Sequence, residues 1–97
     1  MQREVALAIL RDHADELKSS YDVRTLSLFG SVARDEARPE SDVDVLVEFV
    51  GAPTFSGYMD LKFRLEELFG RRVDLVTVGG LRPRVRPYVE RDLIRVA

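Results

Sequence analysis

The sequence predicts an α/β (α+β) fold in which helices pack against one small mixed β-sheet. Three observations lead to this prediction. Apolar residues recur at helical spacing in two segments, residues 2–19 and 58–69. Strand-favouring residues concentrate in three shorter segments, residues 24–29, 42–49 and 72–78. Glycine and proline residues lie between several of these segments, as turns and helix ends require.

The composition favours one globular domain spanning residues 1–97. Apolar residues make up 45% of the chain and charged residues 33%, and the formal net charge is -2. This near-neutral charge gives no general attraction to polyanions, so we do not expect a nucleic-acid partner. The chain has no cysteine, no signal-peptide pattern and no apolar stretch of the ~20 residues that span a bilayer. We therefore expect a cytoplasmic protein without a membrane partner, and leave open whether it forms a homo-oligomer.

The chain is predicted to begin with one amphipathic helix from Gln2 to Ser19. His13 lies within this helix and is the only histidine of the chain, so we expect it at the surface rather than in a metal site. The apolar face of the helix consists of Ala6, Leu10, Ala14 and Leu17, flanked by Val5 and Ile9.

Two strands are predicted next, joined by a short connection. The segment RTLSLF alternates and ends at Gly30, which predicts a strand from Arg24 to Phe29. Residues 31–37 have room for one or two helical turns before Pro39 interrupts the path. A second strand, DVDVLVEF, then runs to Phe49, with apolar residues on both faces as in a central strand.

The second half of the chain repeats the pattern of helix and strand. Leu61, Leu65 and Leu68 predict a helix over residues 58–69, with Gly70 as its C-terminal cap. The segment RVDLVTV predicts a third strand. The proline-containing tail is expected to form a short helix over residues 87–91 and an edge strand over 93–96.

Two aspartates, Asp42 and Asp44, stand at the start of the second predicted strand. Side chains two apart on a strand share a face, so these carboxylates are expected to converge. An isolated carboxylate at the edge of a core costs several kcal/mol unless it is paired, hydrogen-bonded or bound to a cation. Magnesium takes one or two protein carboxylates and leaves its other positions to water and phosphate oxygens. Asp74, at the start of the third strand, is the natural third member of such a site.

These residues meet only in one topology. Gly30 and Ser31 follow the first strand whereas Asp42 begins the second, so the first two strands must run antiparallel. Asp44 and Asp74 both lie near strand starts, so the second and third strands must run parallel, with the helix 58–69 as their crossover. The site is then expected at the N-terminal ends of the second and third strands.

The pair Gly30 and Ser31 suggests a phosphate-binding turn. Glycine lets a ligand approach the backbone closely, and the amides that open the following helical turn point outward with partial positive charge. Ser31 adds a hydroxyl, and the guanidinium of Arg34, one turn later, matches phosphate geometry. Each feature alone is common in ordinary turns, and the prediction rests on their occurrence together with the aspartates.

The arrangement of these motifs resembles the nucleotidyltransferases of the DNA polymerase beta superfamily, and most closely the minimal nucleotidyltransferases of the MntA antitoxin type. The segments that carry the resemblance are LFGSVAR, SDVDVLVEF, LEELFGRRVDLVT and LRPRVRPYVERDLIRVA, in this order. They cover nearly the whole chain. Ten residues, 32–41, separate Ser31 from Asp42. The resemblance implies a polymerase beta-like nucleotidyltransferase fold with ATP as substrate.

The resemblance also assigns roles to residues and implies a partner. Gly30 and Ser31 would hold the triphosphate, Asp42, Asp44 and Asp74 would bind one or two Mg²⁺ ions, and Asp74 would help to activate the attacking hydroxyl. Members of the minimal group are typically paired with a helical HEPN-type toxin. They are understood to silence this toxin by transferring AMP from ATP to one of its tyrosines, or by binding alone.

Two hypotheses follow. The favoured one is a metal-dependent nucleotidyltransferase that adenylylates a HEPN-type toxin, because the carboxylate set is complete. The alternative is a nucleotide-binding antitoxin module that neutralises its partner without catalysis. Because so short a chain is expected to lack a wall that holds an acceptor, the partner would bring its own hydroxyl onto the open face of the sheet. The segment 50–57 and the arginine-rich tail are then the expected contact surfaces.

Overall fold

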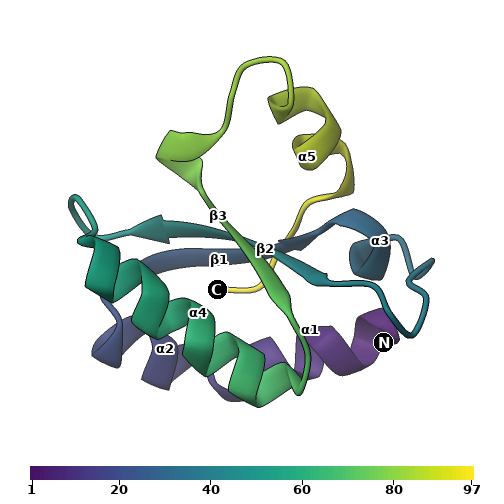
Figure 1. The fold of residues 1–97 in the computed structure, drawn as a ribbon, viewed down its shortest axis with the longest axis horizontal. Coiled ribbons are helices and arrows are strands. Elements are labelled where there is room, and N and C mark those ends of the chain that lie inside the picture. Colours follow the sequence, from purple (N-terminus) through teal and green to yellow (C-terminus); the bar gives the residue numbers. More distant parts are fainter.

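The computed structural model describes all 97 residues, which build a four-stranded mixed sheet with helices on both faces (Figure 1). The strand order is β3-β2-β1-β4. Strand β1 (Val23–Phe29) pairs antiparallel with β2 (Val43–Phe49), and β2 pairs parallel with β3 (Val73–Thr77). The short β4 (Ile94–Arg95) pairs antiparallel with β1. The predicted fold class and both strand orientations are confirmed.

The helices divide between the two faces of the sheet. Figure 1 shows three helices, α1, α2 and α4, together on one face, and the chain from β3 to α5 rising over the other face. The helical elements are α1 (Arg3–Asp12), α2 (Ala14–Ser20), α3 (Gly30–Ala33), α4 (Phe55–Phe69), the 3₁₀ turn η1 (Val78–Gly80) and α5 (Arg86–Asp92). We call residues 78–92, from η1 through α5, the arch. No helix combines the length and apolar character needed to cross a membrane.

The main core lies between the sheet and helices α1, α2 and α4. Alternate residues of β2, namely Val43, Val45 and Val47, are completely buried and belong to this core. Leu61 and Leu65 of α4 belong to the same cluster and are also completely buried. The strand alternation that puts these valines into the core sends the side chains between them to the opposite face, toward the arch.

The predicted single helix over residues 2–19 is wrong, because the chain forms two helices that meet at His13. The backbone of His13 has φ -110° and ψ 7°, outside helical geometry. The ring nitrogen Nδ1 of His13 lies 2.9 Å from the carbonyl oxygen of Ile9, which also accepts the His13 backbone N–H at 3.3 Å. The backbone N–H and the ring of His13 thus both contact the carbonyl of Ile9 at the junction of the two helices.

Helix α4 begins at Phe55, three residues before the predicted start. Its N-cap is Thr54, whose hydroxyl oxygen accepts the backbone N–H of Gly57 at 3.0 Å. The predicted C-terminal cap is confirmed, since Gly70 has the left-handed φ of +66°. The cap residue Gly70 stands four positions before Asp74.

The remaining boundaries differ from the predicted ones by small steps. Strand β2 begins at Val43 rather than Asp42, where the Val43 N–H donates to the carbonyl of Arg72. Asp42 therefore lies just outside the strand. Helix α3 ends at Ala33, so it covers only part of the connection 31–37 for which one or two helical turns were predicted. Strand β4 has two residues and is shorter than the predicted edge strand 93–96.

Leu65→Ala is expected to destabilise the domain by about 2 to 5 kcal/mol, because it leaves a cavity in a completely buried part of the core. Leu68→Ala, on the same helix but only partly buried, is the matched control and should cost less. Urea unfolding followed by circular dichroism measures both. Equal losses for the two variants would contradict the placement of the core.

Candidate active site

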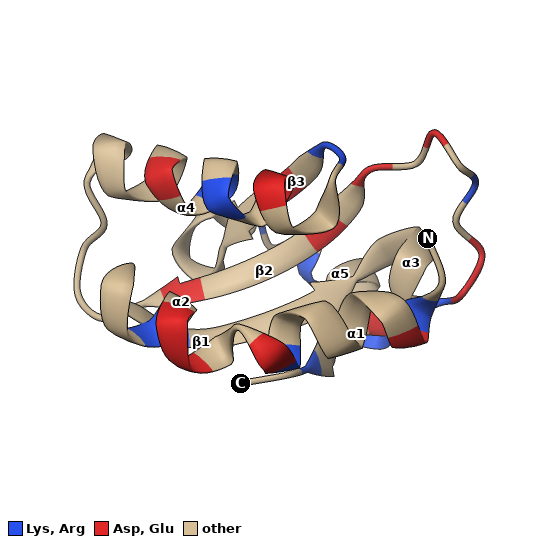
Figure 2. Ribbon diagram, turned by 90° about the horizontal axis from the view of Figure 1, so that it is seen from below, with Lys and Arg blue, Asp and Glu red and all other residues tan.

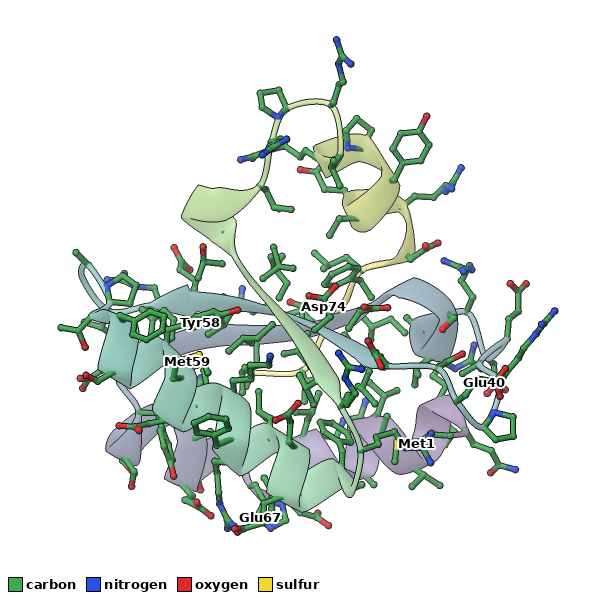
Figure 3. All side chains as sticks on the ribbon, in the orientation of Figure 1. Met1, Glu40, Tyr58, Met59, Glu67 and Asp74 are labelled. Carbon is green, nitrogen blue, oxygen red and sulfur yellow. The ribbon has the colours of Figure 1, made fainter.

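The pairing of the strands places three side chains in one row across the face of the sheet that the arch overlies. Asp44 of β2 is the register partner of Phe29 in β1 and of Asp74 in β3. Asp44 is half-buried and Asp74 is exposed. Figure 3 labels Asp74 at the centre of the molecule, where β3 crosses the sheet below the arch. The predicted meeting of the second and third strands at their N-terminal ends is therefore present in the structure.

Asp42 lies in the loop just before β2 and is exposed. Acidic residues follow the chain from the end of α3 through this loop into β2 (Figure 2). The sequence-based prediction assumed that Asp42 lies in the strand and points to the same face as Asp44. Because Asp42 is outside the strand, the two-residue alternation does not fix the direction of its side chain. The negative charge of Asp42 nevertheless helps to raise the pKa of Asp44.

Gly30 stands directly against the carboxylate of Asp44. A Cβ atom at position 30 would lie 2.1 Å from Oδ2 of Asp44, far inside van der Waals contact. Gly30 also has a φ of +73°, a conformation that residues with a Cβ rarely adopt. Both observations require glycine at this position. Ser31 follows within the four-residue helix α3 and is half-buried.

The electrostatic surroundings of Asp44 disfavour its charged form. Burial, the negative charges of Asp74 and Asp42 and a side-chain hydrogen bond with Asp74 together raise the pKa of Asp44 to about 6, with burial as the largest cause. The positive charge of Arg34 opposes this shift. A carboxylate that is half-buried beside two others is typical of sites built for a cation or a proton.

Arg34, predicted to bind phosphate, is engaged by two carboxylates. Its Nη1 lies 2.7 Å from Oδ2 of Asp92, and its Nε lies 3.2 Å from Oε2 of Glu36. The Asp92 side chain is only 12% exposed, whereas that of Glu36 is 67% exposed. The ion pair with Asp92 connects the end of α3 to the end of α5. Arg34 must therefore leave Asp92, or share it, before it can bind a phosphate.

The carboxylates do not form a ready-made metal cage. No group of three or more aspartate, glutamate, histidine or cysteine side chains is arranged to hold a metal ion. The neighbouring pair Asp44 and Asp74 instead suits the binding mode of Mg²⁺, which takes one or two carboxylates and completes its shell with water and phosphate oxygens. The donor set thus fits an ion that shares its ligands with a bound triphosphate.

A pocket below the arch was missed by the sequence-based reasoning. It has a volume of about 360 Å³, and Asp74 and Arg82 are among its lining residues. Its apolar walls come from Phe29, Val76, Leu81, Val85 and Val89. We call it the arch pocket. The four-residue spacing of Leu81, Val85 and Val89 was the available signal, since it indicates an apolar face along the tail.

The arch also corrects the expectation that the chain has no wall beside the acidic residues. Residues 78–92 supply one over the face of the sheet that carries Asp44 and Asp74. Chemically, the assembled site offers a close-approach turn at Gly30, a hydroxyl at Ser31, two adjacent carboxylates and an apolar pocket at their edge. This combination suits the binding of a phosphorylated ligand together with a second, apolar group.

Comparison with known proteins identifies the family. The model of the nucleotidyltransferase domain family matches residues 10–96. The protein adenylyltransferase MntA of Thermococcus cleftensis is 39% identical over 89 residues, which are 92% of this chain and 90% of that protein.

Solved structures agree with this assignment. A candidate minimal nucleotidyltransferase of known structure is 41% identical, with a TM-score of 0.80 and coverage of 97% of this chain and 95% of its own. A structure of the tri-AMPylated HEPN toxin of Shewanella oneidensis in complex with an MNT antitoxin matches in fold alone, with 16% identity, a TM-score of 0.69 and coverage of 94% of this chain and 71% of that chain. This chain therefore belongs to the nucleotidyltransferase domain family, as a minimal nucleotidyltransferase of the MntA type.

Proposed function

We propose that this protein is a metal-dependent adenylyltransferase that moves AMP from ATP to a tyrosine hydroxyl of a HEPN-type toxin and thereby acts as its antitoxin. The observation that carries the proposal is the row of Asp44 and Asp74 beside Gly30. Gly30 gives a triphosphate close access to the backbone, and the two carboxylates supply ligands for the cation that ATP brings with it. The relationship to the adenylyltransferase MntA supports the choice of AMP as the transferred group.

Each residue of the site has its own proposed role in the transfer of AMP. The backbone at Gly30 and the hydroxyl of Ser31 bind the phosphates, and Arg34 adds a guanidinium once it exchanges Asp92 for phosphate oxygens. Asp42, Asp44 and Asp74 would hold Mg²⁺, which offsets the charge of the triphosphate when it is bound. The acceptor oxygen bonds to the α-phosphorus, the bond from this phosphorus to the bridging oxygen breaks, and pyrophosphate leaves. Asp74 lies at the exposed end of the row, where it can accept the hydroxyl proton.

The identity of the partner rests on the relatives. The Shewanella complex pairs an MNT antitoxin with a tri-AMPylated HEPN toxin, so in that complex the toxin is the modified protein. By analogy, the acceptor here is a side chain of a helical toxin. The open surroundings of Asp74 are consistent with an acceptor that arrives on another protein.

Co-incubation of the protein with its partner toxin, ATP and Mg²⁺ is expected to increase the intact mass of the toxin by one or more adenylate groups. Asp44→Asn should abolish this gain, because it removes a proposed metal ligand beside Gly30. Asp60→Asn, which changes an exposed aspartate of α4, is the matched control and should transfer AMP normally. A toxin that is silenced without any gain in mass would favour the non-catalytic antitoxin instead.

ATP binding is expected to require Mg²⁺, because the clustered aspartates repel the triphosphate until a cation offsets their charge. Isothermal titration calorimetry in Mg²⁺ and in chelator measures the difference, which should be about tenfold or more in affinity, equivalent to at least 1.4 kcal/mol. Asp42→Asn and Asp44→Asn should each remove the Mg²⁺-dependent part. Equal affinity in chelator and in Mg²⁺ would contradict the proposed role of the aspartates.

Asp44→Asn is expected to stabilise the metal-free protein at pH 7 by about 1 kcal/mol, a value reduced for the solvent that reaches this half-buried group. The folded pKa of Asp44, about 6, exceeds its ordinary value of 3.8, so between these pH values the folded state binds a proton that the unfolded state lacks. The wild type should therefore gain stability relative to the variant as the pH falls from 7 to 4. Thermal unfolding in chelator across this range tests it, and a large loss of stability in Asp44→Asn at pH 7 would mean that the carboxylate is structural.

A further inference from the structure

The arch pocket adjoins the proposed reaction centre through Asp74 of β3 and through Phe29 of β1, which directly precedes Gly30. Asp74 is one of its lining residues, whereas Gly30, Ser31 and Asp44 are not. Figure 1 shows the segment from β3 to α5 spanning the space above the sheet. Figure 3 shows that side chains from the chain after β3 and from α5 point into this space. The volume of about 360 Å³ lies at the lower end of the range for ligand pockets, roughly 300 to 1,000 Å³.

We propose that the arch pocket binds the phenol ring of the acceptor tyrosine, so that the transferase itself selects an aromatic hydroxyl. This inference rests on the proposed function and adds the site at which the acceptor is held. The arch itself carries none of the proposed phosphate-binding or metal-binding residues.

The direction of the reaction supports this assignment. Transfer of AMP requires the attacking oxygen and the departing pyrophosphate to lie on opposite sides of the α-phosphorus. The proposed phosphate-binding turn at Gly30 and Ser31 follows β1, while Asp74 lies on β3, with β2 between the two strands. An acceptor opposite the leaving group therefore approaches from the side of Asp74, which forms part of the lining of the arch pocket.

The chemistry of the pocket favours an aromatic over an aliphatic hydroxyl. Five apolar side chains line it, and burying a ring against such walls is favourable in proportion to the apolar area removed from water. A buried tyrosine hydroxyl needs a hydrogen-bond partner, and the Asp74 carboxylate is the acceptor at the edge of this pocket. The phenol oxygen then bonds to the α-phosphorus as its proton passes to Asp74 and pyrophosphate leaves.

The charge at the rim agrees with a peptide as the carrier of the ring. Arg82 lines the same pocket, and Arg82 and Arg84 form no ion pair within the chain. Guanidinium groups at the mouth can bind backbone carbonyls or acidic side chains that flank a tyrosine. Tyr88 and Val85 are exposed on the same arch, at 65% and 45%, and extend the apolar surface outward from the pocket.

A substitution that fills the pocket separates acceptor binding from nucleotide binding. Val85→Phe is expected to raise the KM for the partner toxin by about tenfold or more, as loss of a fitted apolar contact typically does. The affinity for ATP and Mg²⁺, measured by calorimetry, should stay within about twofold of the wild type, because Val85 is not one of the proposed nucleotide-binding residues. A twofold change in affinity corresponds to less than 1 kcal/mol. Val5→Phe is the matched control, because Val5 is equally exposed, at 46%, but lies on α1 across the sheet. A fall in ATP affinity by the same factor as the rise in KM for the toxin would overturn the proposal and assign the pocket to the nucleotide.

A second measurement does not depend on transfer to the toxin. The wild-type protein is saturated with Mg²⁺ and a non-hydrolysable ATP analogue and titrated with N-acetyltyrosinamide, while NMR follows the methyl groups of Val76, Leu81 and Val89. These methyls should shift with N-acetyltyrosinamide and much less with N-acetylserinamide. Equal or absent shifts, or shifts already completed by the nucleotide analogue alone, would overturn the acceptor pocket. Failure of AMP transfer with a positive titration would instead reject only the proposed reaction.

Discussion

The close approach of the Asp44 carboxylate to the backbone at Gly30 is the constraint on which the site depends. It exists because β1 and β2 pair in a register that puts Phe29 opposite Asp44, so that the residue after Phe29 turns past the carboxylate. A side chain at position 30 would overlap Oδ2 of Asp44. The same register, continued into β3, adds Asp74 beside Asp44. Backbone hydrogen bonding between the strands thus brings the proposed phosphate turn and the carboxylates together.

This arrangement sacrifices stability at the site. Burial and the charges of neighbouring aspartates raise the pKa of Asp44, so its ionised form opposes folding in the absence of a cation. The core on the other face of the sheet compensates, since the valines of β2 and the leucines of α4 are completely buried there. A sheet with one face for packing and one for chemistry allows the acidic site to persist in a chain of 97 residues.

A different interaction, the ion pair between Arg34 and Asp92, ties the arch to the rest of the domain. It joins groups 58 positions apart and ties the end of α5 to the connection that follows α3. Asp92 is the more buried partner, so breaking the pair would leave a carboxylate that is poorly hydrated. Any move of Arg34 toward a phosphate therefore acts on the arch as well. The guanidinium of Arg34 thus connects the proposed phosphate turn to the end of the arch.

Much of this protein follows from its sequence. The strand patterns, the helix cap at Gly70 and the need for Asp44 and Asp74 to meet were enough to predict the mixed sheet and the orientation of its strands. The exact helix ends were harder to foresee, as the break at His13 and the Thr54 cap show, because they depend on local backbone geometry and capping rather than on the apolar pattern. The sequence by itself determined which candidate residues stand at the ends of these strands, since residue type and spacing are local properties. Only the tertiary structure decided that Arg34 pairs with Asp92 and that Leu81, Val85 and Val89 line a pocket at Asp74, because these contacts join segments far apart in the chain and depend on how the arch folds back over the sheet.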